Sequence, residues 1–341
     1  MRALVVSVLL IAAACSRPSD RRSPEAPAGT DGRTSPGASV EQRALAKVTS
    51  GEYLALDASH VYWGVAHAPA DGLLDVWRIS KDGGEAKLVV RDLVRLTQQA
   101  QFVVDHRILF GIRRDGVVRV DTDSGRVTVL VSGHGEELLG VAMDDEFVYY
   151  GDNSVPTISR VARGGGPARV LATGEAALSW DITCDGSHVY WFDPGKPFRE
   201  GDEAVRAVQR DGGEILTLCQ GNVGLVGAAE GVAYCASGEG IQAASIKGGS
   251  RGAVIPIAAT MFQIAPTGRA YWYDALHDEK TREWRPSSGT SFTILASNMP
   301  ITSPPVPIAQ GIAQLARFAV DEDHVFLLEP GQLVRRRRSD R

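Results

Sequence analysis

The residues that could carry out chemistry are few in this sequence, and they are scattered. The chain has 7 histidines and 4 cysteines in 341 residues. His134, Asp181 and His277 are the residues best placed for general acid–base catalysis, and we expect them near a channel mouth. No G-x-S-x-G elbow, H-E-x-x-H helix or P-loop accompanies them. The sequence therefore shows no catalytic constellation, and an enzyme is the less favoured interpretation.

The same residues lack the spacing of a metal site. His67, His134 and His277 form no cluster with metal-ligand spacing. Asp181 is the only obvious carboxylate on a predicted inner strand away from a turn, whereas a hard cation takes about six oxygen ligands. The sequence predicts neither a metal ion nor a cofactor.

Three other histidines have a structural explanation. His60, His188 and His324 each directly precede the valine of an aromatic strand. A residue that recurs at one position of a repeat is what the architecture itself produces, and equivalent positions of separate repeats lie far apart. We therefore interpret these histidines as structural residues.

Composition restricts the partners and the fold class. The formal net charge is −5, which argues against a nucleic-acid partner, because such domains usually present a basic face. The chain has 37 glycines, against about 24 expected from average usage. So many glycines indicate many tight turns, which is typical of an all-β protein with short strands.

A repeated unit accounts for most of the chain, and residues 143–171 show one full copy. The copy contains an acidic turn, an aromatic strand, a second strand, a Gly-Gly turn and a last strand. A period of roughly 40–45 residues with four short strands is typical of a β-propeller blade. The sequence therefore predicts a seven-bladed β-propeller, with six blades as the alternative. The aligned aromatic segments are Val61–Trp63, Ile108–Phe110, Val148–Tyr150, Val189–Trp191, Ala233–Cys235, Ala270–Trp272 and Val325–Leu327.

The two ends of the repeat region complement each other. The last copy stops at Arg341 without its fourth strand, and Ala44–Val48 resembles the fourth strand of the other copies. An N-terminal strand that completes the last blade would close the ring and remove two exposed sheet edges. We therefore expect one propeller domain over residues 43–341. Every other arginine of the run Arg335–Arg338 is expected to face solvent, as part of a solvated outer strand, and equivalent positions of other copies also hold arginine (Arg78, Arg119 and Arg160).

The N-terminus has the pattern of an export signal. Arg2 precedes an apolar stretch, Ala3–Ala14, that is too short to span a membrane. Small residues directly before Cys15 resemble the bacterial lipoprotein lipobox, which implies a signal peptide over 1–14 and lipidation of Cys15. An ordinary secretory signal cut near Ala14 is the alternative. Residues 15–42 are rich in Pro, Ser, Gly and Arg, which predicts a disordered tether. We expect a monomer in the bacterial cell envelope, periplasmic or facing the outer membrane, that touches the membrane only through its lipid.

An exported domain permits disulfides. In a propeller the second and fourth strands of a blade run toward the same face, so Cys219 and Cys235 could meet. We favour a Cys219–Cys235 bridge, with Cys184 buried and outside it. The alternative is three separate small core residues.

The repeat also resembles a known group. Tyr149–Asp152, Tyr190–Asp193 and Tyr271–Asp274, each followed by a further strand and most by a Gly-containing turn, are similar to the YWTD repeats of low-density-lipoprotein-receptor propellers and to TolB-like bacterial propeller lipoproteins. The third motif position lacks Thr in all three copies, and YWTD rings have six blades. The resemblance implies a binding or scaffold role, since those families mostly bind proteins.

Loop variation indicates which face would bind. The connections between second and third strands, and between blades, vary in length and share one face, and insertions on one face of a repeat protein usually mark the binding face. We predict a binding or scaffold module whose partner is a protein, a glycan or an envelope polymer. A propeller-type lyase or hydrolase with a site at the channel mouth is the alternative. The candidate binding residues are His277, Tyr273, Asp193, Lys196 and Arg199.

Overall fold

The computed structural model describes residues 41–341 except 50, 68–71, 95–101, 134–136, 175–180, 196–200, 222, 238–239, 256–258, 266–267, 279–282, 288 and 300–303. Within the described part, all regular secondary structure is β-strand. No helix among the described residues has the length and apolar character needed to cross a membrane.

The strands form four-stranded groups, called blades here, and each is named by its first and last strand. The β2–β5 blade contains β2 (Gly51–Leu56), β3 (His60–Ala66), β4 (Leu73–Ser80) and β5 (Lys87–Val94). The next two blades contain β6 (Phe102–Asp105), β7 (Ile108–Arg113), β8 (Gly116–Asp121) and β9 (Val127–Ser132), then β10 (Leu138–Met143), β11 (Phe147–Asp152), β12 (Thr157–Ala162) and β13 (Arg169–Thr173).

The remaining blades repeat the same order of strands. They are β14 (Ile182–Cys184), β15 (His188–Asp193), β16 (Ala204–Gln209) and β17 (Leu216–Gln220); β18 (Gly224–Ala229), β19 (Val232–Ser237), β20 (Gly240–Ser245) and β21 (Ser250–Ile255); and β22 (Ala259–Ile264), β23 (Arg269–Asp278), β25 (Phe292–Asn298) and β26 (Val306–Ile312), with β24 (Glu283–Pro286) added to β23. The last sheet holds β27 (Arg317–Val320), β28 (His324–Glu329), β29 (Gly331–Arg337) and β1 (Gln42–Val48).

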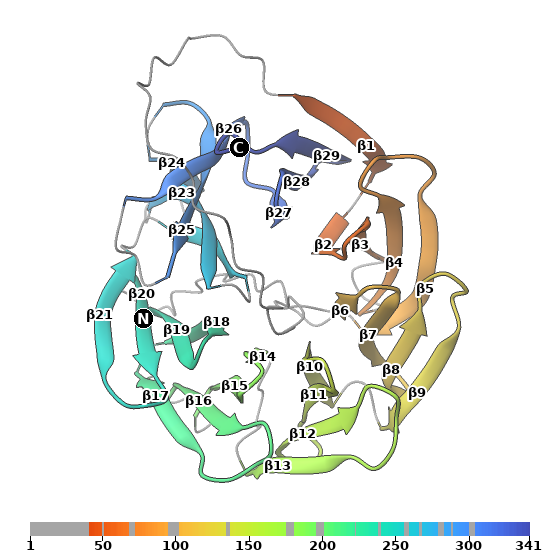
Figure 1. The fold of residues 1–341 in the computed structure, drawn as a ribbon, viewed down its shortest axis with the longest axis vertical. Helices are drawn as coiled ribbons and strands as arrows, with labels where there is room; N and C mark the ends of the chain where they lie inside the picture. The colour runs from red at the N-terminus through yellow and green to blue at the C-terminus, as the bar shows by residue number, and fades with distance from the viewer. Residues whose placement is uncertain are drawn as a thin grey trace, which may run out of the picture.

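The blades stand around a common centre, with β2, β6, β10, β14, β18 and β27 innermost (Figure 1). All strand pairs are antiparallel, and most sheets hold one blade. One eight-stranded sheet joins two blades through a single pair of residues, Leu93 on β5 and Arg113 on β7. The chain is therefore an all-β ring of antiparallel sheets.

An aspartate at the end of the innermost strand builds each of the best repeated turns. One carboxylate oxygen of Asp57, Asp144, Asp185 or Asp321 accepts hydrogen bonds from the backbone N–H groups two and three residues later, at 2.6–3.0 Å. In three of these turns a tyrosine hydroxyl on the second strand donates to the other oxygen. An Asp side chain that satisfies backbone donors in this way favours a turn, which explains why the acidic turn and the aromatic strand recur together.

Glycine permits the tight turn between the third and fourth strands. In the β2–β5 blade, Gly83 and Gly84 have φ angles of 90° and 115°, values that residues with a side chain rarely adopt. Gly165 and Gly166 occupy the same position two blades later, with φ angles of 93° and 124°. The Gly-Gly repeat of the sequence therefore marks a backbone conformation.

The hydrophobic core lies between blades. Each buried apolar cluster of the described residues joins side chains of at least two successive blades, as Tyr149 and Trp191 do between the β10–β13 and β14–β17 blades. One cluster contains Trp63 of β3 together with Phe326 of β28, so the last sheet packs on the first. Burial between blades makes each blade depend on its neighbours for stability.

The N-terminal strand β1 pairs with β29 as the outer strand of the last sheet, from Gln42 opposite Arg336 to Val48 opposite Gly331. This is the pairing expected from the sequence. Figure 1 shows β2, which follows β1 in the chain, beside the innermost strand β27. Two polar contacts join the same sheets: Lys81 Nζ lies 2.9 Å from Asp321 Oδ2, and Arg335 Nη1 donates to the Lys81 carbonyl at 2.8 Å.

The expectation that third-strand arginines face solvent is wrong for Arg78 and Arg160, which are buried. In the run Arg335–Arg338 burial alternates as expected, with Arg336 and Arg338 buried and Arg337 exposed. Arg78 reaches Asp123 on the next blade at 2.7 Å, and Arg160 reaches Asp211 on the next blade at the same distance. A long side chain on an outer strand can lie along the neighbouring blade and place its charge on that blade's turn. These arginines link the blades.

Cys219 at the end of β17 and Cys235 on β19 form a disulfide. This is the pair favoured from the sequence, and it joins two successive blades. Cys184 is buried, and its thiol donates to the carbonyl of Met143 at 3.1 Å.

Candidate functional site

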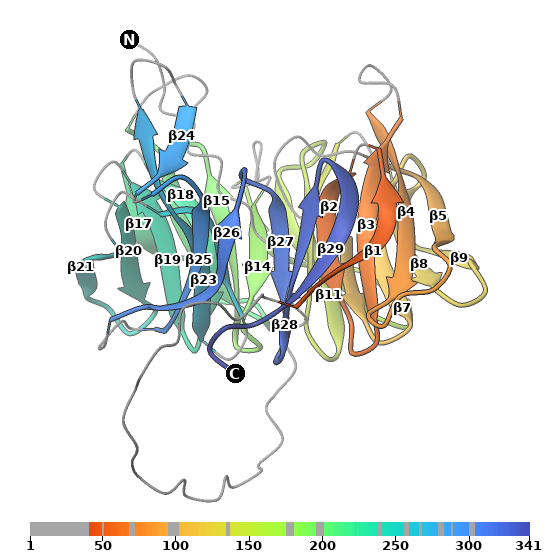
Figure 2. The same cartoon turned by 90° about the horizontal axis from the view of Figure 1, so that it is seen from above.

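The two faces of the ring differ in their connections. The long-loop face carries the connections between second and third strands of each blade, and the short-turn face carries the Asp turns and Gly-Gly turns. Figure 2 shows the β23–β24 hairpin and the β3–β4 hairpin extending from the same side of the ring. Side chains near those hairpins can meet a partner without disturbing the repeat.

Tyr273 is not available on that face, and its prediction as a binding residue is wrong. The side chain is fully buried, packs edge-on against Phe292 and Phe318, and donates from its hydroxyl to the Ala316 carbonyl at 3.0 Å. Burial raises the pKa of the Tyr273 hydroxyl above its ordinary value. The strand β23 continues past Tyr273 to Asp278, so the residue belongs to the core of the blade.

Asp193 also differs from the expectation of an exposed loop residue. It is the last residue of β15 and is buried, with Oδ2 located 2.7 Å from Arg206 Nε on the adjacent strand. Its other oxygen accepts the backbone N–H of Gly195 at 2.9 Å. Because both oxygens have partners within the protein, Asp193 stabilises the start of the loop and does not offer a free carboxylate to a ligand.

Other predicted residues are placed only in part. His134, Lys196 and Arg199 lie outside the described residues, as do the signal peptide and Cys15. The backbone of His277 pairs with Trp284 in the β23–β24 hairpin on the long-loop face. Asp181 precedes the innermost strand β14, and burial raises the pKa of its carboxyl well above its ordinary value. Because His134 lies outside the described residues, the grouping of His134, Asp181 and His277 near a channel mouth stays a prediction.

A cluster that the sequence does not predict lies in the β2–β5 blade. Leu74 pairs with Leu93 and Val76 pairs with Val90, so Arg91 and Asp92 on β5 together oppose the single residue Asp75 on β4. Two residues opposite one define a β-bulge, a feature that redirects side chains and is common beside functional sites. Asp92 has a φ of 59°, a left-handed conformation that aspartate tolerates better than most residues.

The bulge brings a histidine and two carboxylates together. His67 follows β3, and its backbone N–H donates to the Leu73 carbonyl at 3.0 Å. Its ring Nε2 lies 2.8 Å from Asp75 Oδ1, and its Nδ1 lies 3.8 Å from Asp92 Oδ1. The side chain of Asp75 is 12% exposed, that of His67 30% and that of Asp92 51%. The carboxylate at the base of the cluster is thus sheltered, while the other two side chains reach solvent.

Two further groups hold Asp75 in place. The backbone N–H of Asp92 donates to Asp75 Oδ1 at 3.3 Å, and Arg91 Nη1 lies 3.4 Å from Asp75 Oδ2. Beside the cluster, an open groove of about 280 Å³ runs along β5 and is lined by Arg91, Asp92 and Arg113, among others. The groove leaves room next to the cluster for water or a small ligand.

This arrangement has two chemical uses. A histidine oriented by a buried carboxylate can act as a base. An imidazole with two carboxylates can also bind a divalent metal ion. Sequence reasoning missed the cluster because it depends on the bulge that places Asp92 beside Asp75 and His67. The only signal was an acidic residue inside each of two neighbouring strands of one blade.

Comparison with known proteins extends the fold description. No protein-family model matches the chain, and no curated protein matches its sequence. Among solved structures, virginiamycin B lyase from Staphylococcus aureus is similar, with 11% identity, a TM-score of 0.56, and coverage of 87% of this chain and 98% of that one. An oligogalacturonate lyase from Vibrio parahaemolyticus is similar with 11% identity and a TM-score of 0.56 over 87% of this chain and 93% of that one.

The chain has the β-propeller fold. An acylaminoacyl peptidase is also similar, with 10% identity and a TM-score of 0.57. The aligned region covers 83% of this chain and 51% of the peptidase. The chain thus spans about half the length of that peptidase. Such low identities establish the architecture alone, since one fold supports many functions.

Proposed function

We propose that this propeller is an exported binding module whose partner, a protein or an envelope polymer, docks on the long-loop face. The observation that carries the proposal is the unequal use of charge on the two faces. On the short-turn face, the repeated Asp and Arg side chains are joined across blades. On the long-loop face, His67, Arg91 and Asp92 belong to no repeat and remain partly exposed.

We further propose that the ring is closed and has seven blades. Three observations support closure. Strand β1 pairs with β29, and one hydrophobic cluster joins the last sheet to the first. In addition, Arg335 Nη1 lies 3.2 Å from Asp82 Oδ1 in the first blade. The last contact repeats the link that Arg160 makes to the turn of its next blade. The two blades of the eight-stranded sheet meet at one residue pair only, which supports counting them separately.

The anchoring of the protein follows from its N-terminal sequence. We propose that Cys15 carries lipid after removal of residues 1–14, and that residues 15–42 act as a tether between the membrane and the propeller. Metabolic labelling with a palmitate analogue tests this. The native chain should be labelled, and Cys15→Ser should lose the label. A labelled Cys15→Ser variant would contradict lipidation at this residue.

Photo-crosslinking from each face tests the binding role. A crosslinking amino acid replaces Arg91 or Val155 on the long-loop face, or Asp82 or Asp211 on the short-turn face. All four positions are similarly open, with exposed fractions from 64% to 93%. The full chain is expressed in the bacterial envelope, and crosslinked products are separated by size.

We expect crosslinked species from Arg91 or Val155 and few or none from Asp82 and Asp211. Equal crosslinking from both faces, or none from the long-loop face, would overturn the proposal. The matched exposure of the four positions matters, because a difference between faces then reports partner contact and not access of the crosslinker.

A second candidate function is an enzyme, favoured by one observation. The ring of His67 lies 2.8 Å from the sheltered carboxylate of Asp75, the pairing by which a carboxylate orients a general base. Incubation with oligogalacturonate and with virginiamycin B, the substrates of the two similar lyases, tests this role. Turnover that His67→Ala abolishes would favour the enzyme, and absence of turnover would favour the binding module.

A further inference from the structure

The cluster around the bulge contains imidazole nitrogen and carboxylate oxygen atoms that lie close enough together to bind one metal ion. One atom from each of His67, Asp75 and Asp92 can be chosen so that all three lie within 4.8 Å of one another. Asp75 lies on β4, Asp92 lies on the neighbouring β5, and His67 directly follows β3 in the same sheet, so the backbone brings the three side chains close together. Ligands that are already close together lower the ordering cost of binding an ion.

One distance is close to that between neighbouring metal ligands. Two ligands bonded at about 2.0–2.1 Å to tetrahedral Zn²⁺ lie about 3.3 Å apart. His67 Nε2 and Asp75 Oδ1 are 2.8 Å apart, so a small separation of the two side chains would admit an ion. Asp92 must swing toward the same nitrogen, and its half-exposed side chain has the freedom to do so.

The surroundings orient the least exposed ligand. The Asp92 N–H holds Asp75 Oδ1, and Arg91 approaches Asp75 Oδ2. Outer contacts of this type fix the direction of a metal-binding carboxylate. Arg91 also brings a positive charge next to the site. Its side chain is 67% exposed, so it can turn away when a cation enters, although its charge opposes binding.

We propose that His67, Asp75 and Asp92 bind one divalent transition-metal ion, with Zn²⁺ as the best fit. Imidazole nitrogen with two carboxylates suits Zn²⁺, whereas Ca²⁺ requires about six oxygen ligands and Mg²⁺ holds mostly water and oxygen. Solvent water completes the coordination from the exposed side. This inference is independent of the proposed binding function, because the ion needs no partner.

Titration calorimetry of the full mature chain with ZnCl₂ tests the site. We expect one ion bound per chain. His67→Ala and Asp92→Asn should each weaken the affinity about tenfold or more, because each removes one of three ligands. Arg91→Ala should tighten it severalfold, because a repelling charge is lost. Asp92 is half exposed, so Asp92→Asn remains informative even where a change at buried Asp75 would disturb folding.

His106→Ala is the matched control. His106 lies beside Asp105 in a turn, as another His–Asp pair, but its side chain is 84% exposed. The control should leave the affinity unchanged. No Zn²⁺ binding, binding that His67→Ala leaves intact, or tighter binding of Ca²⁺ than of Zn²⁺ would overturn the proposal.

Discussion

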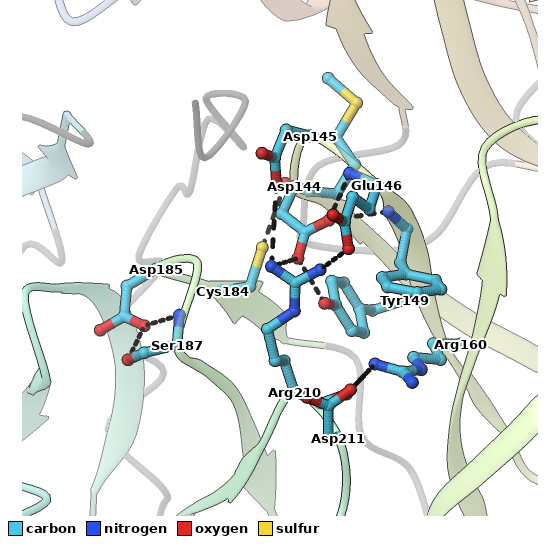
Figure 3. Close-up of polar contacts among 12 residues, drawn as sticks. Asp144, Asp145, Glu146, Tyr149, Arg160, Cys184, Asp185, Ser187, Arg210 and Asp211 are labelled. Atoms are coloured by element: carbon cyan, nitrogen blue, oxygen red, sulfur yellow. Dashed lines mark hydrogen bonds and ion pairs between the residues drawn. The ribbon is translucent and has the colours of Figure 1, made fainter. Parts of the chain in front are cut away.

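The junction between the β10–β13 and β14–β17 blades contrasts with the cluster around His67. At the junction, Asp144 is buried, accepts two backbone N–H groups and accepts the Tyr149 hydroxyl at 2.5 Å. Figure 3 shows Arg210 of the next blade pointing at Asp144 and Glu146, with the Arg160–Asp211 pair beside it. Around His67, the charges are partly exposed, and the part of the chain that the structure describes does not repeat this cluster in another blade.

The comparison separates two uses of the same residue types. At the junction, burial and the Asp144 carboxylate raise the pKa of Tyr149 above its ordinary value, so the hydroxyl keeps its proton as a donor. Such fully satisfied networks hold blades together. Around His67, the side chains are positioned by a bulge and retain access to solvent. Charges that repeat therefore build the ring, and charges outside the repeat are the candidates for function.

The largest effect is expected at the junction. Asp144→Ala should lower the free energy of unfolding by about 3–5 kcal/mol, because the Tyr149 hydroxyl and two backbone N–H groups lose their acceptor at a buried position. Urea denaturation followed by tryptophan fluorescence measures the change. Asp145→Ala is the control, because Asp145 is half exposed and 3.8 Å from Arg210, and it should cost at most about 0.5 kcal/mol. If both variants lost the same amount of unfolding free energy, burial of Asp144 at the junction would not explain its contribution.

A smaller effect is expected for the arginines that link blades. Arg160→Met should lower the free energy of unfolding by about 1–3 kcal/mol, since its hydrogen bond to Asp211 is lost and its stacking on Phe147 is altered. Arg335→Met removes the equivalent link between the last and first sheets and should cost a similar amount. Urea midpoints of the two variants provide the comparison. A negligible effect of Arg335→Met alone would argue against a closed ring.

The junctions should also respond to acid. Burial acts to raise the pKa of Asp185, but hydrogen bonds from Tyr190, the Gly231 N–H and the His188 N–H outweigh it, so this pKa lies below its ordinary value of 3.8. A lowered pKa contributes stability above about pH 4 that is lost as the pH falls through the folded-state value. The Asp185 contribution to the urea midpoint should change little between pH 6 and pH 4.5 and should be lost from pH 4.5 to pH 3, so the midpoint should fall less over that second step in Asp185→Asn. If the urea midpoint of that variant fell with pH as much as that of the native chain, groups other than Asp185 would cause the acid sensitivity.

The smallest effect is expected at the His67 cluster. His67→Ala and Asp92→Ala should each change the free energy of unfolding by at most about 1 kcal/mol without added metal, because both side chains reach solvent. Thermal denaturation with and without Zn²⁺ measures this. Losses as large as those of Asp144→Ala would mean that the cluster is part of the structural network, and the comparison drawn above would fail.

Several structural features followed from local sequence. The acidic turns and Gly-Gly turns are visible because a carboxylate or a positive φ solves a local backbone problem in a few residues. The pairing of β1 with β29 was accessible because one strand was missing from the last copy. The exposure of the third-strand arginines was predicted wrongly, since the burial of Arg160 depends on a neighbouring blade that the local pattern does not include.

The candidate site also combines features that the local sequence suggested with features that only the folded structure shows. Tyr273 was assigned to a loop because the aromatic motif ends there, but β23 continues and encloses it. His67, Asp75 and Asp92 were separate residues in the sequence, and a bulge on β5 brings them together. A bulge adds one residue to one strand, and nothing in the residue types around Asp92 marks that position.

The sequence by itself determined the repeat, its turns and the all-β character of the chain, because each depends on side chains acting on their own backbone. Only the tertiary structure decided which charges are buried between blades and which acidic residues face His67. Those outcomes depend on how strands and neighbouring blades pack, because distance and burial set the strength of every electrostatic contact.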